Sequence, residues 1–343
     1  MTFRSWRGLA PGLATLALGA GAMSAALAAT ATRRPDAPDR SSGSARAETA
    51  NPAVPVPPQL AVGLRVLRLV DRSRTIRLTD GGSEPRTLVT DIRYPALGAP
   101  SATDIPNARA ASAQAPYPLI VFAHGFGVTP QTYSRLLQSW ARAGYVVAAP
   151  VFPLSNADAP GGPDEADVIN QPRDLSFVIS GLLSLSRPGA GPLAGLVDPG
   201  RIAVAGHSDG AETALATAYS RRFRDRRIGA ALILSGAEME GVGGYSFTQG
   251  GPPLLAVQGT ADTFNEPKYT EMYFTRASRP KFLLDLLGAG HLPPYSYQQP
   301  QLAIVERVTT AFLDGYLKRE PDALQQLIPF GDVVRTSALV AEP

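Results

Sequence analysis

From residue 118 onward, short and continuously apolar runs alternate with longer segments of helical pattern. The apolar runs, which we predict as strands, cover residues 118–123, 145–149, 201–205, 228–234, 253–257 and 281–287. Helices are predicted at 132–143, within 164–186, from about 211, at 266–277 and at 301–317. A continuously apolar strand is typical of one buried on both faces. We therefore predict an α/β fold whose central sheet is mostly parallel, with helices on both faces and no large cap domain.

The first residues are typical of an export signal. Arg4 and Arg7 precede an apolar stretch at 9–27 that is rich in Ala, Gly and Leu, and two small-x-small patterns follow it. The alternative is an uncleaved membrane anchor, since the stretch is just long enough to span a bilayer. We interpret residues 1–31 as a cleaved signal peptide, which predicts a secreted, extracellular protein without stable membrane insertion.

Residues 32–58 are rich in Pro, Ser, Ala and Arg without a period, which indicates a disordered linker. The catalytic domain is predicted to span 59–343. Two segments near its start, 60–70 and 86–94, are rich in Val, Leu and Ile and flank a turn signal. They are predicted to form antiparallel strands at the beginning of the sheet.

Charge and cysteine content exclude several classes of function. The formal net charge is +3, and cleavage of residues 1–31 would remove Arg4 and Arg7 and no acid, leaving +1. Basic residues are scattered among acids, so the sequence gives no sign of nucleic-acid binding, which needs a local excess of positive charge. The chain has no cysteine, which excludes disulfides, a cysteine nucleophile and thiolate metal sites.

The strand at 201–205 runs into Gly206-His207-Ser208-Asp209-Gly210, and a predicted helix follows. This is the G-x-S-x-G pattern in the strand–turn–helix context that its chemistry requires, because the serine must sit on a tight bend where only glycines fit on either side. An incidental Gly-Ser-Gly turn is the alternative. We predict Ser208 as a nucleophile.

A serine hydroxyl needs a general base to act as a nucleophile near neutral pH. The chain has three histidines. His207 is adjacent to Ser208, where consecutive side chains diverge, and His124 ends an earlier strand. His291 follows the last predicted parallel strand in a flexible loop, so we predict His291 as the base.

The acid that orients the base is predicted to be Asp262. It lies in the loop that leaves the carboxyl end of the strand at 253–257, where an acid can reach the imidazole. An ordinary turn aspartate is the alternative. The other carboxylates between the predicted nucleophile and base are Asp209, Glu212, Asp225, Glu238, Glu240, Glu266, Glu271 and Asp285. They fall in the elbow, in polar loops, on a helix or in mid-strand.

His124-Gly125-Phe126-Gly127 follows the first buried parallel strand. Folds of this kind take one oxyanion donor from this loop and one from the residue after the nucleophile. We therefore predict the backbone N–H groups of Phe126 and Asp209 as the oxyanion hole. His124 is interpreted as a structural residue that braces the loop.

The segment Tyr94-Pro95 and the motifs H-G-F-G, G-H-S-D-G, G-T-A-D and G-A-G-H occur in this order. In this they resemble the dienelactone-hydrolase-like branch of the α/β-hydrolase superfamily. Within that branch they are similar to platelet-activating-factor acetylhydrolases, chlorophyllase-like esterases and bacterial cutinases or polyester hydrolases. The resemblance covers about residues 60–318 and implies the same roles for the five predicted site residues. The sequence departs from bacterial polyester hydrolases in lacking a C-terminal disulfide and in having an acid after the nucleophile.

Taken together, the motifs predict a secreted serine hydrolase of carboxylic esters that works through an acyl-enzyme, without metal or organic cofactor. The expected substrate is a small-molecule or polymeric ester. Alternatives on the same scaffold are an acyltransferase, a peptidase, or a non-catalytic binding protein derived from a hydrolase.

Overall fold

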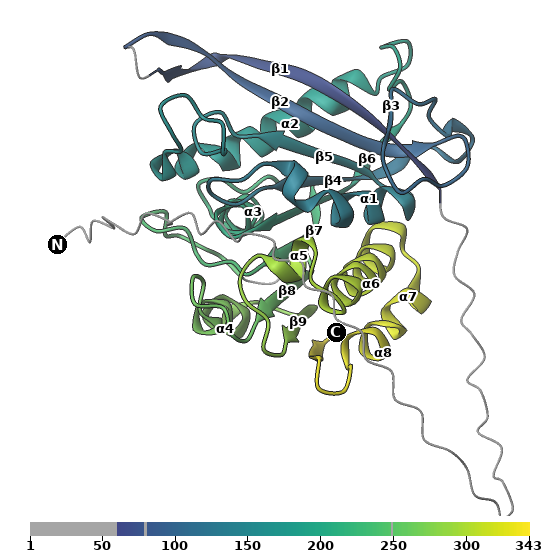
Figure 1. The fold of residues 1–343 in the computed structure, drawn as a ribbon, viewed down its shortest axis with the longest axis vertical. Helices are drawn as coiled ribbons and strands as arrows, with labels where there is room; N and C mark the ends of the chain where they lie inside the picture. The colour runs from purple at the N-terminus through teal and green to yellow at the C-terminus, as the bar shows by residue number, and fades with distance from the viewer. Residues whose placement is uncertain (1–59, 79–80, 248–249) are drawn as a thin grey trace, which may run out of the picture. The chain divides into compact units, whose positions relative to one another are not determined.

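The computed structural model describes residues 60–78, 81–247 and 250–343 (Figure 1). The predicted signal peptide and linker lie outside the described residues. The strands form one ten-stranded sheet in the order β10-β9-β8-β7-β6-β4-β5-β2-β1-β3. Its central six strands, from β9 to β5, pair in parallel, which confirms the predicted mostly parallel α/β sheet.

The six central strands are β4 (Tyr117–Ala123), β5 (Val146–Val151), β6 (Val197–His207), β7 (Ile228–Leu234), β8 (Leu254–Gly259) and β9 (Lys281–Leu286). Each contains most of an apolar run predicted from the sequence. Every residue of β4 and β8 is buried, as expected for strands covered on both faces.

Antiparallel strands complete both ends of the sheet. At one end, β1 (Ala61–Arg77) and β2 (Ser83–Ala96) form a long ribbon, whose two strands lie side by side in Figure 1. This confirms the predicted antiparallel pair and extends it by several residues. β2 pairs with β5, and the two-residue β3 (Ile105–Pro106) pairs with β1. At the other end, β10 (Ser337–Glu342), which the sequence analysis did not predict, pairs with β9.

The longer helices are α1 (Ser134–Arg142), α2 (Gln171–Leu185), α3 (Asp209–Tyr219), α4 (Pro267–Arg276) and α6 (Gln301–Leu313). Three short helices are α5 (Pro293–Ser296), α7 (Pro321–Gln325) and α8 (Leu327–Gly331). The predicted helix within 164–186 is divided into a 3-10 segment, Glu165–Asn170, and α2. Pro172 in the first turn of α2 is well placed there, because its missing N–H would have no intrahelical partner.

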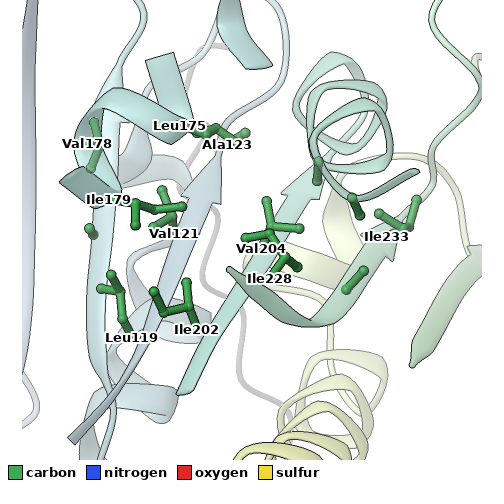
Figure 2. Close-up of a cluster of buried hydrophobic side chains, with 14 of the residues drawn as sticks. Leu119, Val121, Ala123, Leu175, Val178, Ile179, Ile202, Val204, Ile228 and Ile233 are labelled. Carbon is green, nitrogen blue, oxygen red and sulfur yellow. The ribbon is translucent and has the colours of Figure 1, made fainter. Parts of the chain in front are cut away.

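Two hydrophobic cores lie on the two faces of the sheet. One contains side chains from α2, α3 and α4, and the other contains side chains from α1 and α6. Figure 2 shows part of the first core, where Val178 and Ile179 of α2 face Val121 of β4. Helices therefore cover both faces, as predicted.

In the described part of the chain, no connection between sheet and helices is long enough to form a large cap domain. Among those same residues, no helix is long and apolar enough to cross a membrane.

A buried ion cluster ties the β1–β2 ribbon to α2. The Arg86 guanidinium donates to Asp174 at 2.6 Å and to Asp167 at 2.7 Å, and all three side chains are nearly inaccessible to solvent. Arg74 reaches the other oxygen of Asp174 at 2.8 Å. A cavity of about 360 Å³ adjoins this cluster, and Leu154 is one of its lining residues. None of the predicted site residues lines it.

Candidate active site

The predicted nucleophile sits on a strained bend between β6 and α3. Ser208 has φ 57° and ψ −127°, a conformation that a non-glycine residue seldom adopts. The two flanking glycines are required by packing. A Cβ on Gly206 would collide with the backbone of Gly210, and a Cβ on Gly210 would collide with the backbone of Ala123 at the end of β4. The G-x-S-x-G motif is thus explained residue by residue.

The structure brings Ser208, His291 and Asp262 together at the carboxyl ends of β6, β9 and β8. The Ser208 Oγ lies 2.9 Å from His291 Nε2, and His291 Nδ1 lies 2.7 Å from Asp262 Oδ2. A carboxylate only accepts, so Nδ1 carries the proton and Nε2 is free to accept from the serine hydroxyl. This is the tautomer that a general base needs.

Asp262 is held in place by three donors. Its Oδ1 accepts from the backbone N–H groups of Phe264 at 2.9 Å and Asn265 at 3.1 Å, and its Oδ2 accepts from His291. Burial opposes ionisation, but the hydrogen bonds and charge of His291 outweigh it and lower the pKa of Asp262 below its usual value. Asp285, by contrast, lies within β9 opposite Ala338 of β10.

The loop predicted to form the oxyanion hole lies against the nucleophile. A Cβ built on Gly125 would be 3.2 Å from the Ser208 Cβ. The amide of Asp209, in the first turn of α3, has no intrahelical acceptor. Within the described ranges, the Phe126 amide makes no hydrogen bond, whereas the next amide, of Gly127, donates to the Ser155 carbonyl at 2.9 Å.

The other two histidines are buried and brace the site. His124 Nε2 accepts from the Phe152 amide at 3.1 Å, so its Nδ1 donates to the Gly125 carbonyl at 2.8 Å. Burial lowers the pKa of His124 to about 4, which keeps the ring neutral. His207 lies beneath the elbow, and its ring centroid is 4.6 Å from that of His291.

Two phenylalanines near the catalytic groups are exposed. Phe126 of the oxyanion loop is 40% exposed and Phe264 is 72% exposed. The Phe264 ring centroid lies 5.2 Å from the His291 ring. The sequence analysis did not identify Phe264, although its position two residues after Asp262 places it at the same edge of the sheet.

Two carboxylates, Asp209 and Glu212, lie in the first turn of α3, directly after the nucleophile. Burial and the nearby charge of Glu165 raise the pKa of Asp209 to about 6. Burial and the charge of Asp209 raise the pKa of Glu212 well above its usual value. One buried oxygen of Asp209, Oδ2, has no hydrogen-bond partner among the described residues. In those residues, no group of three or more His, Cys, Asp or Glu side chains could hold a metal ion.

Comparisons with known proteins agree with this fold. Residues 101–264, which include Ser208 and Asp262, match the family model described as chlorophyllase. A solved structure of a ferulic acid esterase from Streptomyces cinnamoneus is similar, with a TM-score of 0.59 and 24% identity. The similarity covers 79% of this chain and 93% of that one. No curated protein matches significantly. The chain therefore has the fold of this esterase structure and is similar to the chlorophyllase family over residues 101–264.

Proposed function

We propose that this chain is a serine hydrolase of carboxylic esters, with Ser208 as nucleophile, His291 as general base and Asp262 as the orienting acid. The observation that carries the proposal is the pair of contacts at His291. The Ser208 hydroxyl donates to Nε2 over 2.9 Å, while Nδ1 donates to a buried carboxylate over 2.7 Å. Hydroxyl, imidazole and carboxylate in this order can move one proton away from the attacking oxygen.

The reaction follows from this arrangement. Ser208 Oγ attacks the ester carbonyl carbon as its proton passes to His291 Nε2, and the carbonyl oxygen becomes an oxyanion that accepts from the Phe126 and Asp209 amides. The C–O bond to the alcohol breaks, and the departing oxygen takes the proton from His291. Water then attacks the acyl carbon while His291 removes its proton. Breakdown of this second intermediate releases the acid and returns the proton to Ser208.

The substrate we propose is an ester with an apolar or aromatic group that packs on the exposed rings of Phe126 and Phe264. The exposed Phe264 ring lies 5.2 Å from the His291 ring, and the exposed Phe126 follows Gly125 in the loop that lies against Ser208. Burial of such apolar area on binding is favourable. Polymeric esters fit the same requirement, because their repeating groups can reach an exposed surface.

Purified protein tests the proposal directly with p-nitrophenyl esters of rising acyl length and with a fluorophosphonate probe. Ser208→Ala should abolish probe labelling and reduce kcat/KM by several orders of magnitude, because members of a triad act as a unit. Ser184→Ala, which removes an exposed hydroxyl on α2, is the matched control and should behave as wild type. Near-normal turnover in Ser208→Ala would refute the assignment of the nucleophile.

We further propose that residues 1–31 direct export and are removed, so that the enzyme acts outside the cell. The basic start, the apolar stretch and the small-x-small patterns support this. N-terminal sequencing of the exported protein should find a start near Ala29 or Thr32. An intact Met1 on membrane-bound protein would contradict cleavage.

A further inference from the structure

His207, which the mechanism does not use, connects the loops that carry the catalytic groups. Its ring is 2% exposed, and both nitrogens have partners. Nδ1 lies 2.8 Å from the Tyr133 hydroxyl, and Nε2 lies 2.9 Å from the backbone carbonyl oxygen of His291. The Tyr133 hydroxyl is in turn 3.3 Å from the backbone N–H of Gly125.

The direction of each of these hydrogen bonds can be deduced. A carbonyl oxygen only accepts, so His207 Nε2 carries a proton and donates to His291. Burial keeps the ring neutral by lowering the pKa of His207 to about 3, so Nδ1 is an acceptor and Tyr133 donates to it. The Tyr133 oxygen then accepts from Gly125. One continuous chain therefore runs from the oxyanion loop through Tyr133 and His207 to the loop of the base.

We propose that His207 and Tyr133 are positioning residues for ester hydrolysis, which fix the oxyanion loop and the His291 loop relative to the Ser208 nucleophile. The inference rests on the proposed function, because it assigns a role in that reaction. Neither residue makes a hydrogen bond to a side-chain atom of the triad. They act through the backbone of Gly125, next to the Phe126 donor, and through the backbone of His291.

The packing around Tyr133 and His207 indicates that they position the catalytic loops and do not merely fill the core. A Cβ on Gly125 would lie 3.2 Å from the Tyr133 hydroxyl and 3.3 Å from His207 Nδ1, so the loop is pressed directly onto both. The His207 ring also lies 4.6 Å from the His291 ring and 5.0 Å from that of Tyr295. A shift of His207 would therefore move the base as well as the loop.

Neutrality of His207 also serves the reaction. His291 becomes an imidazolium while it holds the serine proton, and a second positive charge at van der Waals distance would oppose that state. The charge of His291 lies among the causes that lower the pKa of His207, after burial. Lysine or arginine at position 207 would carry the opposing charge permanently.

Tyr133→Phe tests this row of hydrogen bonds with the smallest change. The ring, which packs 4.9 Å from that of Phe122, is retained, and only the hydroxyl between Gly125 and His207 is lost. We expect kcat on a p-nitrophenyl ester to fall about 10- to 100-fold, because a small misplacement of catalytic groups has an effect of this size. KM should stay within about three-fold of the wild-type value, since Tyr133 and His207 do not contact the substrate.

Tyr117→Phe is the matched control. It removes another buried tyrosine hydroxyl, which donates to the Ala111 carbonyl at 2.6 Å at the opposite end of β4 from the site. We expect a loss of thermal stability in both variants but a loss of kcat only in Tyr133→Phe. Equal kcat in the two variants, or a KM effect alone, would overturn the inference.

A second pair of variants separates the two arms of His207. In His207→Asn the amide oxygen can replace Nδ1 and accept from Tyr133, whereas in His207→Gln the longer amide can replace Nε2 and donate to His291. Each should retain more kcat than His207→Ala. Adding Tyr133→Phe should lower kcat little further in His207→Gln, which has already lost the acceptor for the Tyr133 hydroxyl. In His207→Asn, which keeps that acceptor, it should lower kcat by its full effect. Additive losses in both would overturn the proposed positioning role. Where Tyr133→Phe fails to fold, equal kcat in His207→Asn, His207→Gln and His207→Ala would overturn it.

These outcomes differ from a failure of the proposed function. If Ser208→Ala keeps its activity, the assignment of the nucleophile is wrong and the positioning role has no reaction to serve. If Ser208→Ala is inactive and Tyr133→Phe is normal, only the positioning role is wrong.

Discussion

Replacement of Asp209 by Asn should stabilise the protein at neutral pH. The carboxyl pKa rises from 3.8 in the unfolded chain to about 6 in the folded protein, chiefly because the group is buried. A raised acid pKa means that the folded state binds the proton more tightly. Stability is therefore lost as the pH rises from about 3.8 to 6, and the full cost of ionisation remains above that window.

The size of this cost follows from the shift. About two pKa units at 1.36 kcal/mol each correspond to roughly 3 kcal/mol. We therefore expect Asp209→Asn to be roughly 3 kcal/mol more stable than wild type above pH 7, with the difference becoming small near pH 4.

Urea unfolding at a series of pH values from 4 to 8 measures this difference. Asp158→Asn is the matched control, because Asp158 is exposed and its carboxylate makes no hydrogen bond within the described residues. Its stability should follow wild type at every pH. A difference for Asp209→Asn that does not grow with pH, or a less stable variant at pH 7 to 8, would refute the reasoning.

The same variant reports on the oxyanion hole. The backbone N–H of residue 209 is retained in Asp209→Asn, while the negative charge beside the developing oxyanion is removed. We expect kcat/KM above pH 6 to rise. A large fall would mean that the carboxylate itself takes part in the reaction.

Three further predictions concern the triad, the fold and the substrate. Asp262→Asn should lower kcat by about 10⁴-fold through loss of the correct tautomer of His291, whereas Asp285→Asn should have little effect in the same ester assay, and the opposite result would reassign the acid. Arg86→Ala should destabilise the protein to urea by about 3–5 kcal/mol, because Asp167 and Asp174 both lose the buried guanidinium that they share, although Arg74 still pairs with Asp174, and a loss under about 1 kcal/mol would contradict the importance of the cluster. Phe264→Ala should raise KM for aryl esters several-fold and leave acetate esters little changed, and equal effects on both would argue against an aromatic contact.

The central sheet was predictable because its strands carry their own signal. A strand buried on both faces must be apolar at every position, and the runs in β4, β7 and β8 satisfy this without reference to the rest of the chain. The apolar run in β10 has only four residues, 338–341, and none of them is fully buried. The six residues of β10 become a strand because the open edge of β9 pairs with them, and a contact of that kind is set by tertiary structure.

The candidate site was predictable for a different reason. Parallel strands place their carboxyl ends at one edge, so Ser208, Asp262 and His291 had to be near one another once each was assigned to a strand end. With three histidines in the chain, elimination left one base. The link between Tyr133 and His207 joins residues 74 positions apart through a rotamer and a tautomer, which no local pattern encodes.

The strain at Ser208 shows how the sequence motif and the packed tertiary structure depend on each other. A residue held in this region of φ and ψ costs about 1–3 kcal/mol, so the surrounding structure must impose it. The Ser208 amide donates to the Leu234 carbonyl at the end of β7, and the Ser208 carbonyl accepts from Glu212 in the first turn of α3. A neighbouring strand and the following helix thus fix both sides of the bend. The G-x-S-x-G pattern permits the bend, but the packed sheet and helix hold it, and for that reason the motif indicates a nucleophile only where a buried strand precedes it and a helix follows.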